Sequence, residues 1–236
     1  MAGSPAATSG SAKRSIGVPP GLPEDADPEL IATVVSLIAE AGEPYSTWFF
    51  GGRAQARAAL ADWLRRPSSE VSATRVELVH DEQRSLAGLF IGVPGADLAS
   101  CRKSDLLVAV AAAQDADARC ELVERIRQSR NLFLGVEAGE YYLSKMAVVA
   151  ERRGRRLGRL VLDSFLASGE ARGYRQFSLD VAAQNAPAVK LYTSAGFREQ
   201  AARQRAGMRY LRMKLSRVTL AVLPVLKGFE WFPVVG

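Results

Sequence analysis

The residues best suited to chemistry are the glycines and arginines of 151–158, ERRGRRLG, which follow a run rich in Tyr, Leu and Val at 141–150. Such a run favours a strand, and a helix is expected from Leu157 onward. A turn into a helix leaves backbone N–H groups without partners inside the helix, and the helix dipole adds partial positive charge there. With the arginine side chains, these donors attract an anion. The stretch therefore predicts a phosphate-binding turn.

The spacing within the turn indicates which phosphate it binds. No Gly-Lys-Ser/Thr follows, as a P-loop requires, and the Gly-x-Gly-x-x-Gly of dinucleotide folds is absent. Arg153-x-x-Arg156-x-Gly158, after Ala147-Val148-Val149, resembles the acyl-CoA loop of the GNAT N-acetyltransferase superfamily, usually Arg/Gln-x-x-Gly-x-Gly/Ala. The chain departs from that loop at Arg156, where the first glycine is usual. An arginine there permits a backbone N–H contact but a less close approach of the pyrophosphate.

A second motif follows the predicted strand 176–181, QFSLDV. It consists, in the order N-x-x-A-x-x-L-Y-x-x-x-G-F, of Asn185, Ala188, Leu191, Tyr192, Gly196 and Phe197. This order resembles the closing motif of the same superfamily. Either motif alone would be a weak signal. Both motifs, in the right order and at the right separation, make the resemblance strong.

The resemblance implies a GNAT fold of the α/β (α+β) class, with a central mixed, mostly antiparallel sheet flanked by helices. It also implies acetyl-CoA as the cofactor, with its pantetheine paired along the splayed edge of the strand 141–149. The backbone N–H of Val148 would serve as oxyanion donor. The implied cofactor-binding residues are Met146, Ala147, Val148, Arg153, Gly154, Arg155, Arg156, Leu157, Gly158, Arg159, Asn185 and Tyr192.

Acetyl transfer to an amine needs an acid for the departing thiolate, and the family match assigns this role to Tyr192. A phenol that titrates near ~10 can protonate a thiolate near ~8.5. Asn185 can cap a short helix that carries this tyrosine in its second turn. The structural alternative for Tyr192 is a packed core tyrosine, and for Asn185 a cap without any cofactor contact.

The amine must also lose a proton, since a lysine-like group titrates near ~10.4. Asp180 is the first candidate base, because it lies on the polar face of 176–181 and projects away from the predicted helix 157–172. Its position resembles that of the Glu in the L-E-V-x-x-x-N stretch of ribosomal-protein alanine acetyltransferases. Glu140, just before the cofactor strand, is the second candidate. A solvated or salt-bridged carboxylate is the alternative for both.

Composition limits the possible partners. The chain has 236 residues, 48% hydrophobic and 24% charged, which is ordinary for a soluble globular protein. Without the five arginines of 152–159, Lys+Arg falls from 31 to 26 against 25 acids, so the net charge of +6 is mostly local and nucleic acid is not expected. The single His80 and the absence of CxxC disfavour a metal site. Cys101 and Cys120 are expected as free thiols in a cytoplasmic protein, with a disulfide as the alternative. No stretch reaches the ~20 apolar residues of a membrane span.

The chain divides into a flexible arm at 1–26, an acetyltransferase domain at 27–217 with a helical insertion at 97–130 before the cofactor strand, and an apolar extension at 218–236. That extension predicts a homodimer contact. Further predicted elements are helices from Asp27 to near Gly42, 53–64, 104–113 and 116–129, a hairpin at 74–93 and a strand at 208–218. The aromatic segment 44–52 either lines an acceptor pocket or is a loop on the core, and the insertion either sets specificity or thickens the core.

The sequence therefore predicts an N-acetyltransferase that uses acetyl-CoA to acetylate a primary amine by direct attack in a ternary complex. Direct attack is favoured because no cysteine lies in the cofactor motifs. A small-molecule amine and a protein or peptide amine both fit as the acceptor. The alternative is a non-catalytic acyl-CoA sensor or partner-docking module of the same fold.

Overall fold

The computed structural model describes residues 21–23, 25–154 and 156–217. Most of the predicted arm and all of the predicted extension lie outside the described residues, as does the dimer contact assigned to that extension. The last residues of the arm are attached to the domain, because the Leu22 N–H donates to the Ala73 carbonyl at 2.9 Å and Leu22 packs against the core.

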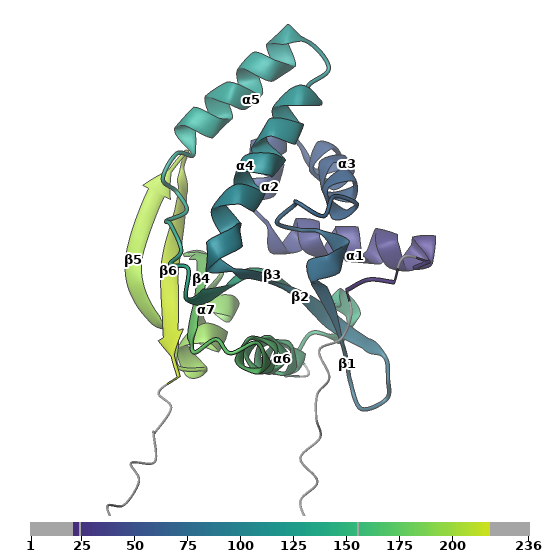
Figure 1. Ribbon diagram of the computed structural model, residues 1–236, viewed down its shortest axis with the longest axis vertical. Helices are drawn as coiled ribbons and strands as arrows, with labels where there is room; N and C mark the ends of the chain where they lie inside the picture. The colour runs from purple at the N-terminus through teal and green to yellow at the C-terminus, as the bar shows by residue number, and fades with distance from the viewer. Residues whose placement is uncertain (1–20, 24, 155, 218–236) are drawn as a thin grey trace, which may run out of the picture.

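Six strands form a single mixed sheet in the order β1-β2-β3-β4-β6-β5 (Figure 1). They are β1 (Val76–His80), β2 (Leu86–Pro94), β3 (Glu140–Val148), β4 (Gln176–Ala182), β5 (Arg198–Arg205) and β6 (Met208–Ser216). Only β3 and β4 are parallel, and every other neighbouring pair is antiparallel. The expected mixed, mostly antiparallel sheet flanked by helices is confirmed.

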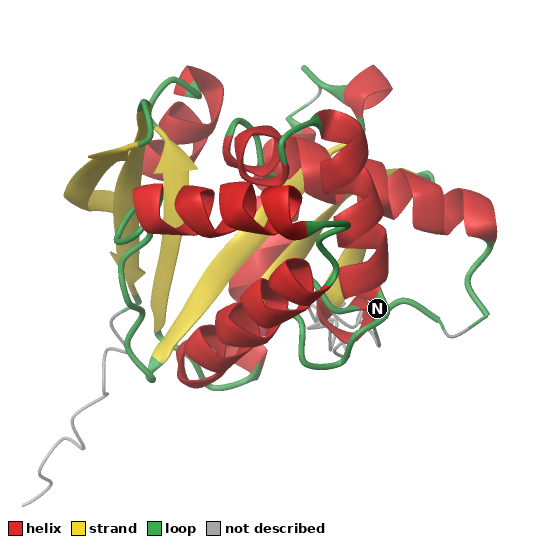
Figure 2. Ribbon diagram, turned by 90° about the horizontal axis from the view of Figure 1, so that it is seen from above, coloured by secondary structure: helices red, strands yellow, loops and turns green. Residues whose placement is uncertain are grey.

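Helices cover both faces of this sheet, as Figure 2 shows from above. They are α1 (Pro28–Ala41), α2 (Tyr45–Phe50), α3 (Arg53–Leu64), α4 (Gly95–Ala111), α5 (Ala116–Gln128), α6 (Leu157–Ala171) and α7 (Ala186–Ser194). One core joins α6 and α7 to one face of the sheet, and another joins α1 and α3 to the opposite face. Among the described residues, no helix is long and apolar enough to cross a membrane.

The strands β3 and β4 separate half-way along their length. Their parallel pairing runs from Glu140 opposite Gln176 to Leu143 opposite Leu179 and stops there. The other edge of β3 stays paired to β2 from Tyr141 to Val148, apart from one irregularity. The second half of β3 therefore faces a gap, and this gap organises the functional site.

A β-bulge lies at the point of separation. Ile91 of β2 pairs with Lys145, whereas the next residue, Gly92, pairs with Leu143, so Ser144 is an extra residue in β3. The bulge shifts the alternation of side chains. Ser144 and Lys145 consequently both face the α1–α3 side, while Leu143 and Met146 belong to the core beneath α6.

Two sequence-based expectations need correction, and one strand was not predicted. The helix predicted to begin at 104 is α4, which begins at Gly95 directly after β2, because Asp105 is not a capping residue but a buried side chain inside the helix. The aromatic segment contains the helix α2 and is not a loop. Residues 198–205, which show no apolar alternation, form the edge strand β5, most of whose side chains are exposed or half-buried. Cys101 and Cys120 are free thiols, as expected.

Candidate functional site

The gap between β3 and β4 leaves backbone donors of β3 without strand partners. Val149 N–H donates to the Ala87 carbonyl of β2 at 3.0 Å. Because successive residues of a strand point their N–H groups to opposite edges, the Val148 N–H is directed toward β4, where the pairing has already ended. Val148, with Met146 two residues before it, is thus placed to bond an extended ligand chain in the gap.

The turn that follows β3 presents the N-terminus of α6. Arg156 precedes this helix with a left-handed backbone (φ 61°), and no side chain caps the first turn. A Cβ added at Gly158 would meet the Leu191 side chain at 3.3 Å, so the start of α6 lies beside α7. Among the described residues, the N–H groups of Leu157 and Gly158 have no hydrogen-bond partner, so they are donors available at one end of the gap. Gly154 takes φ 79° within the turn, and Arg155 lies outside the described residues.

The arginines of the turn do not form one free cluster. Arg152 pairs with Asp81 of the β1–β2 turn, Arg153 with Glu40 and Arg159 with Asp163 of its own helix. The side chains of the pairs of Arg153 and Arg159 are about half exposed, whereas Arg152 and Asp81 are 20% and 9% exposed. Among the described residues, Arg156 is the cation of the turn that has no acidic partner. Exposed pairs are weak, so Arg153 and Arg159 can exchange their partners for an anion at small cost.

Tyr192 lies on the same side of the sheet, in the second turn of α7. The Asn185 side chain caps this helix, since its Oδ1 accepts from the Ala188 N–H at 3.2 Å. The Tyr192 hydroxyl is 3.8 Å from the Met146 sulfur and the residue is 8% exposed. Burial raises the pKa of Tyr192, so its hydroxyl keeps its proton at neutral pH. It is therefore a proton donor located beside the gap.

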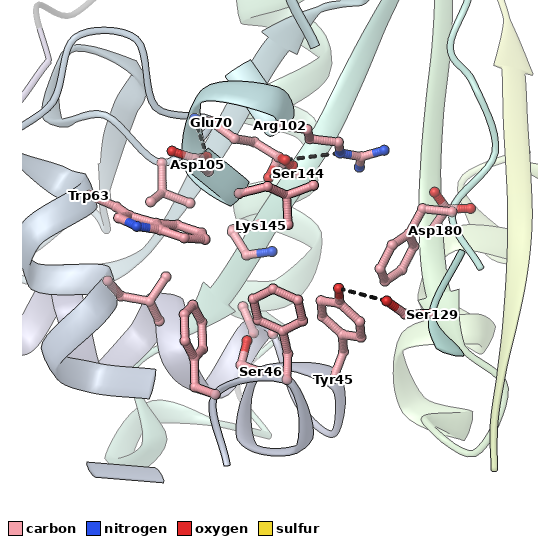
Figure 3. A pocket seen from close by; sticks show the side chains of 18 of the residues that line it. Tyr45, Ser46, Trp63, Glu70, Arg102, Asp105, Ser129, Ser144, Lys145 and Asp180 are labelled. Atoms are coloured by element: carbon pink, nitrogen blue, oxygen red, sulfur yellow. Dashed lines mark hydrogen bonds and ion pairs between the residues drawn. The ribbon is translucent and has the colours of Figure 1, made fainter. Parts of the chain in front are cut away.

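A cavity of about 340 Å³ reaches the gap from the opposite face (Figure 3). Its aromatic lining comprises Tyr45, Phe49, Phe50, Trp63, Phe133, Tyr142 and Tyr210, and its principal polar lining comprises Glu70, Arg102, Asp105, Ser129, Ser144, Lys145 and Asp180. Ser144 and Lys145 come from the unpaired half of β3 and Asp180 from β4. The cavity and the Tyr192 hydroxyl thus approach the same opening from two sides of the sheet.

A network of polar side chains holds one wall of the cavity. Glu70, between α3 and β1, accepts from Ser144 Oγ at 2.6 Å and from Arg102 Nε at 3.0 Å. Arg102 Nη2 donates to the Tyr142 hydroxyl at 3.0 Å, and this hydroxyl donates to Asp180 Oδ2 at 3.0 Å. Burial alone would raise the pKa of Glu70, but the charges of Arg102 and Lys145 keep it below its ordinary value. Glu70 is therefore an ionised, fully engaged carboxylate.

Two other acidic groups of this wall differ in their surroundings. Asp180 is 3% exposed and is bound by Arg212. Asp105 accepts from the Glu70 backbone N–H at 2.9 Å through one oxygen, while its Oδ1 is buried without a partner among the described residues. Burial raises the pKa of Asp105 to about 6.

Comparison with known proteins bears directly on this arrangement. Residues 116–217 match the family model described as an acetyltransferase (GNAT) domain, and this segment contains β3, the turn, α6, β4 and α7. This match relates the second half of the chain to that family. None of the curated proteins matches the chain.

Solved structures resemble most of the chain in fold. An N-acetyltransferase from Staphylococcus aureus Mu50 matches with a TM-score of 0.55 and 20% identity over 80% of this chain and 97% of its own. SsHAT matches with a TM-score of 0.53 and 17% identity over 82% and 96%. A further acetyltransferase matches with a TM-score of 0.51 and 23% identity over 80% and 93%. At these identities the likeness concerns the fold.

The fold places the two carboxylates predicted from the sequence at different ends of β3. Asp180 lines the cavity beside the gap. Glu140 begins β3 at the paired end, opposite Gln176, and its buried carboxylate accepts a hydrogen bond from Lys214. The structure therefore does not bring Glu140 to the gap, and the salt-bridged alternative describes its surroundings.

The cavity also contains residues that the sequence did not single out, namely Glu70, Arg102, Asp105, Tyr142 and Lys145. The one sequence signal for this cavity was the aromatic content of residues 44–52. In the structure, α2 of that segment contributes Tyr45, Phe49 and Phe50 to the cavity wall. No local pattern marks the polar residues, because their partners are distant in the chain. Arg102 and Glu70 are 32 residues apart, and Ser144 and Glu70 are 74 apart.

Proposed function

We propose that the protein is an acetyl-CoA-dependent N-acetyltransferase that acetylates a primary amine, of a small molecule or a peptide, by direct attack in a ternary complex. The observation that carries this proposal is the position of Tyr192 and of the aromatic cavity on opposite sides of one gap beside β3. A thioester in that gap would have an acid on one side and an acceptor site on the other.

The chain fits the cofactor through groups that the fold leaves unpaired. When bound, acetyl-CoA supplies the thioester that the amine attacks. The N–H groups of Leu157 and Gly158, with Arg156, would hold its pyrophosphate, and the Val148 N–H would stabilise negative charge on the carbonyl oxygen. Tyr192 would give its proton to the departing sulfur.

The proton of the amine also needs an acceptor. Asp180 stays the proposed base, because it lies at the gap whereas Glu140 lies at the other end of β3. Asp180 is bound to Arg212, so accepting a proton would weaken that ion pair. Water in the cavity is the other route for this proton.

Release of free thiol from acetyl-CoA tests the proposal. The full chain is incubated with acetyl-CoA and panels of small amines and peptide amines, and products are identified by mass spectrometry. We expect thiol release that requires an amine and is reduced in the Tyr192→Phe variant. Calorimetric binding of CoA without any amine-dependent release would instead indicate a sensor, and absence of binding to the folded chain would contradict both functions.

A further inference from the structure

Lys145 is the cation at the centre of the cavity. The bulge at Ser144 turns it away from the core beneath α6 and toward the aromatic wall. Figure 3 shows its ammonium group pointing into the cavity, between Tyr45 and the Glu70–Arg102 pair. Uninterrupted alternation from Tyr142 would point Lys145 to the α6 face, whereas the bulge leaves Ser144 and Lys145 both on the cavity face.

Three acids surround Lys145: Asp105 binds the Glu70 N–H through one oxygen only, and the other two are committed to other groups. Glu70 is bound by Arg102 and Ser144, and Asp180 is bound by Arg212 and Tyr142. Among the described residues, none lies within ion-pair or hydrogen-bond distance of the Lys145 ammonium. The cavity therefore contains a cation without a partner in the fold.

Such a cation is unfavourable in apolar surroundings. Burial lowers the pKa of Lys145, with Glu70 partly opposing this effect. A buried charge is stabilised by an opposite charge at close range, and a ligand that supplies one recovers part of the cost of burial. An acceptor with an acidic group would do so, whereas an acceptor without one would not.

The rest of the cavity defines the remainder of the ligand. Tyr45, Phe49 and Trp63 provide aromatic surfaces, which favour an apolar or aromatic body. A volume of about 340 Å³ is near the lower end of the ~300–1,000 Å³ typical of small-molecule sites. A single ammonium suits one carboxylate, since the fork of Arg102, which would suit a phosphate better, is already occupied.

We propose that the acceptor is an aromatic α-amino acid or a close analogue, whose carboxylate binds the Lys145 ammonium and whose ring packs among Tyr45, Phe49 and Trp63. This inference rests on the proposed N-acetyltransferase function. In the reaction, the α-amino nitrogen forms the amide bond to the acetyl carbon and the carbon–sulfur bond breaks. The neutral amine gives one proton to Asp180 or to water, Tyr192 gives one to the sulfur, and solvent then returns a proton to Tyr192. Lys145 takes no part in these bonds and determines specificity.

Matched pairs of acceptors test the proposal. Phenylalanine is compared with 2-phenylethylamine, and tryptophan with tryptamine, since the members of each pair differ in the carboxylate alone. We expect the wild type to have a kcat/KM for the amino acids at least about tenfold above that for the amines, the equivalent of one ion pair. In Lys145→Met this preference should vanish through a higher KM for the amino acids, with kcat largely kept.

Two further variants control the comparison. Lys103→Met removes an exposed lysine of α4 outside the cavity and should keep the wild-type preference. Lys145→Arg keeps a cation and should retain part of the preference for the amino acids over the amines. Unfolding midpoints in urea show whether each variant is folded.

Several results would overturn the inference while leaving the proposed function intact. One is a wild type that acetylates the amines as well as the amino acids. Another is a Lys145→Met variant that loses kcat equally for both members of a pair with an altered pH profile, because Lys145 would then act on the amine proton. If no acceptor releases thiol, the proposed function fails, and calorimetry of phenylalanine binding decides the inference: tighter binding to wild type than to Lys145→Met supports it, and equal or absent binding overturns it.

Discussion

Arg212 binds the carboxylate of Asp180 with two of its nitrogens, Nε to Oδ1 at 2.9 Å and Nη2 to Oδ2 at 2.7 Å. Both side chains are 3% exposed. The guanidinium also donates to the carbonyls of Leu134 and Gly135 at 2.7 and 2.8 Å. A single buried ion pair thus joins β4, β6 and the segment that leads into β3, next to the cavity.

Asp180→Asn should lower the free energy of unfolding by about 3–5 kcal/mol, because it leaves the Arg212 charge buried without a counter-charge. Urea denaturation measures the loss. Asp163→Asn, in an exposed pair with Arg159, is the matched control and should change stability little. Adding Arg212→Met to Asp180→Asn should recover most of the loss, and a double variant less stable than the single one would contradict the assignment.

If Asp180 is also the base, turnover of the folded variant should fall most at lower pH, where the amine holds its proton.

Tyr192→Phe should lower kcat on the order of 100-fold, the usual contribution of a positioned proton donor, without weakening acetyl-CoA binding. The ring stays packed against Phe197 and only the hydroxyl beside Met146 is removed. Thiol release measures kcat and calorimetry measures affinity. Tyr174→Phe removes a hydroxyl from the ring stacked on Tyr141 and serves as the control. Unchanged turnover in Tyr192→Phe would remove this residue from the mechanism.

Much of the fold could be predicted because its signals are local. The start of α1 is marked by Asp27 and Pro28, α3 has the predicted bounds, and Asn185 caps α7 as expected. Each signal depends on residues within one or two turns of a helix. The gap between β3 and β4 was predicted from the family resemblance. The structure confirms it, because the pairing of the two strands ends at Leu143 and Leu179.

The acceptor side could not be predicted, since its features depend on pairing between distant segments. The bulge at Ser144 exists only in the register with β2, and the sequence of β3 alone would alternate Lys145 onto the other face. From the sequence alone, Asp105 is predicted to lie at the start of a helix. In the structure its carboxylate accepts a hydrogen bond from the backbone N–H of Glu70, 35 residues away. The edge strand β5 lacks an apolar face and so gave no strand signal.

Arg156→Gly should raise the free energy of unfolding by about 0.5–1 kcal/mol, because a left-handed backbone is costly for a residue with a Cβ and free for glycine. Arg156→Ala removes the same charge but keeps the Cβ, so it should not be stabilised. Both variants should bind acetyl-CoA more weakly at low salt than the wild type, and Arg156→Gly should lose less because it allows a closer approach of the pyrophosphate. Arg127→Ala, at an exposed position of α5, should leave affinity unchanged. Equal stability of the Gly and Ala variants would contradict the strain argument.

Asp105→Asn should remove one contribution to the pH dependence of the free energy of unfolding. Burial raises the pKa of Asp105 from 3.8 to about 6, so the folded chain holds this proton more tightly than the unfolded chain does. The resulting stabilisation is complete below the ordinary pKa and is lost as the pH rises through 6. Asparagine does not titrate, so the variant should gain about 2–3 kcal/mol relative to wild type between pH 4 and pH 8. Urea unfolding at both pH values measures this gain, and Asp117→Asn, at an exposed position in the first turn of α5, should show none. The prediction would be contradicted if the free energy of unfolding of Asp105→Asn differed from that of wild type by the same amount at both pH values. The Asp105 carboxylate would then be charged in the folded chain down to its ordinary pKa, and its Oδ1 would be solvated.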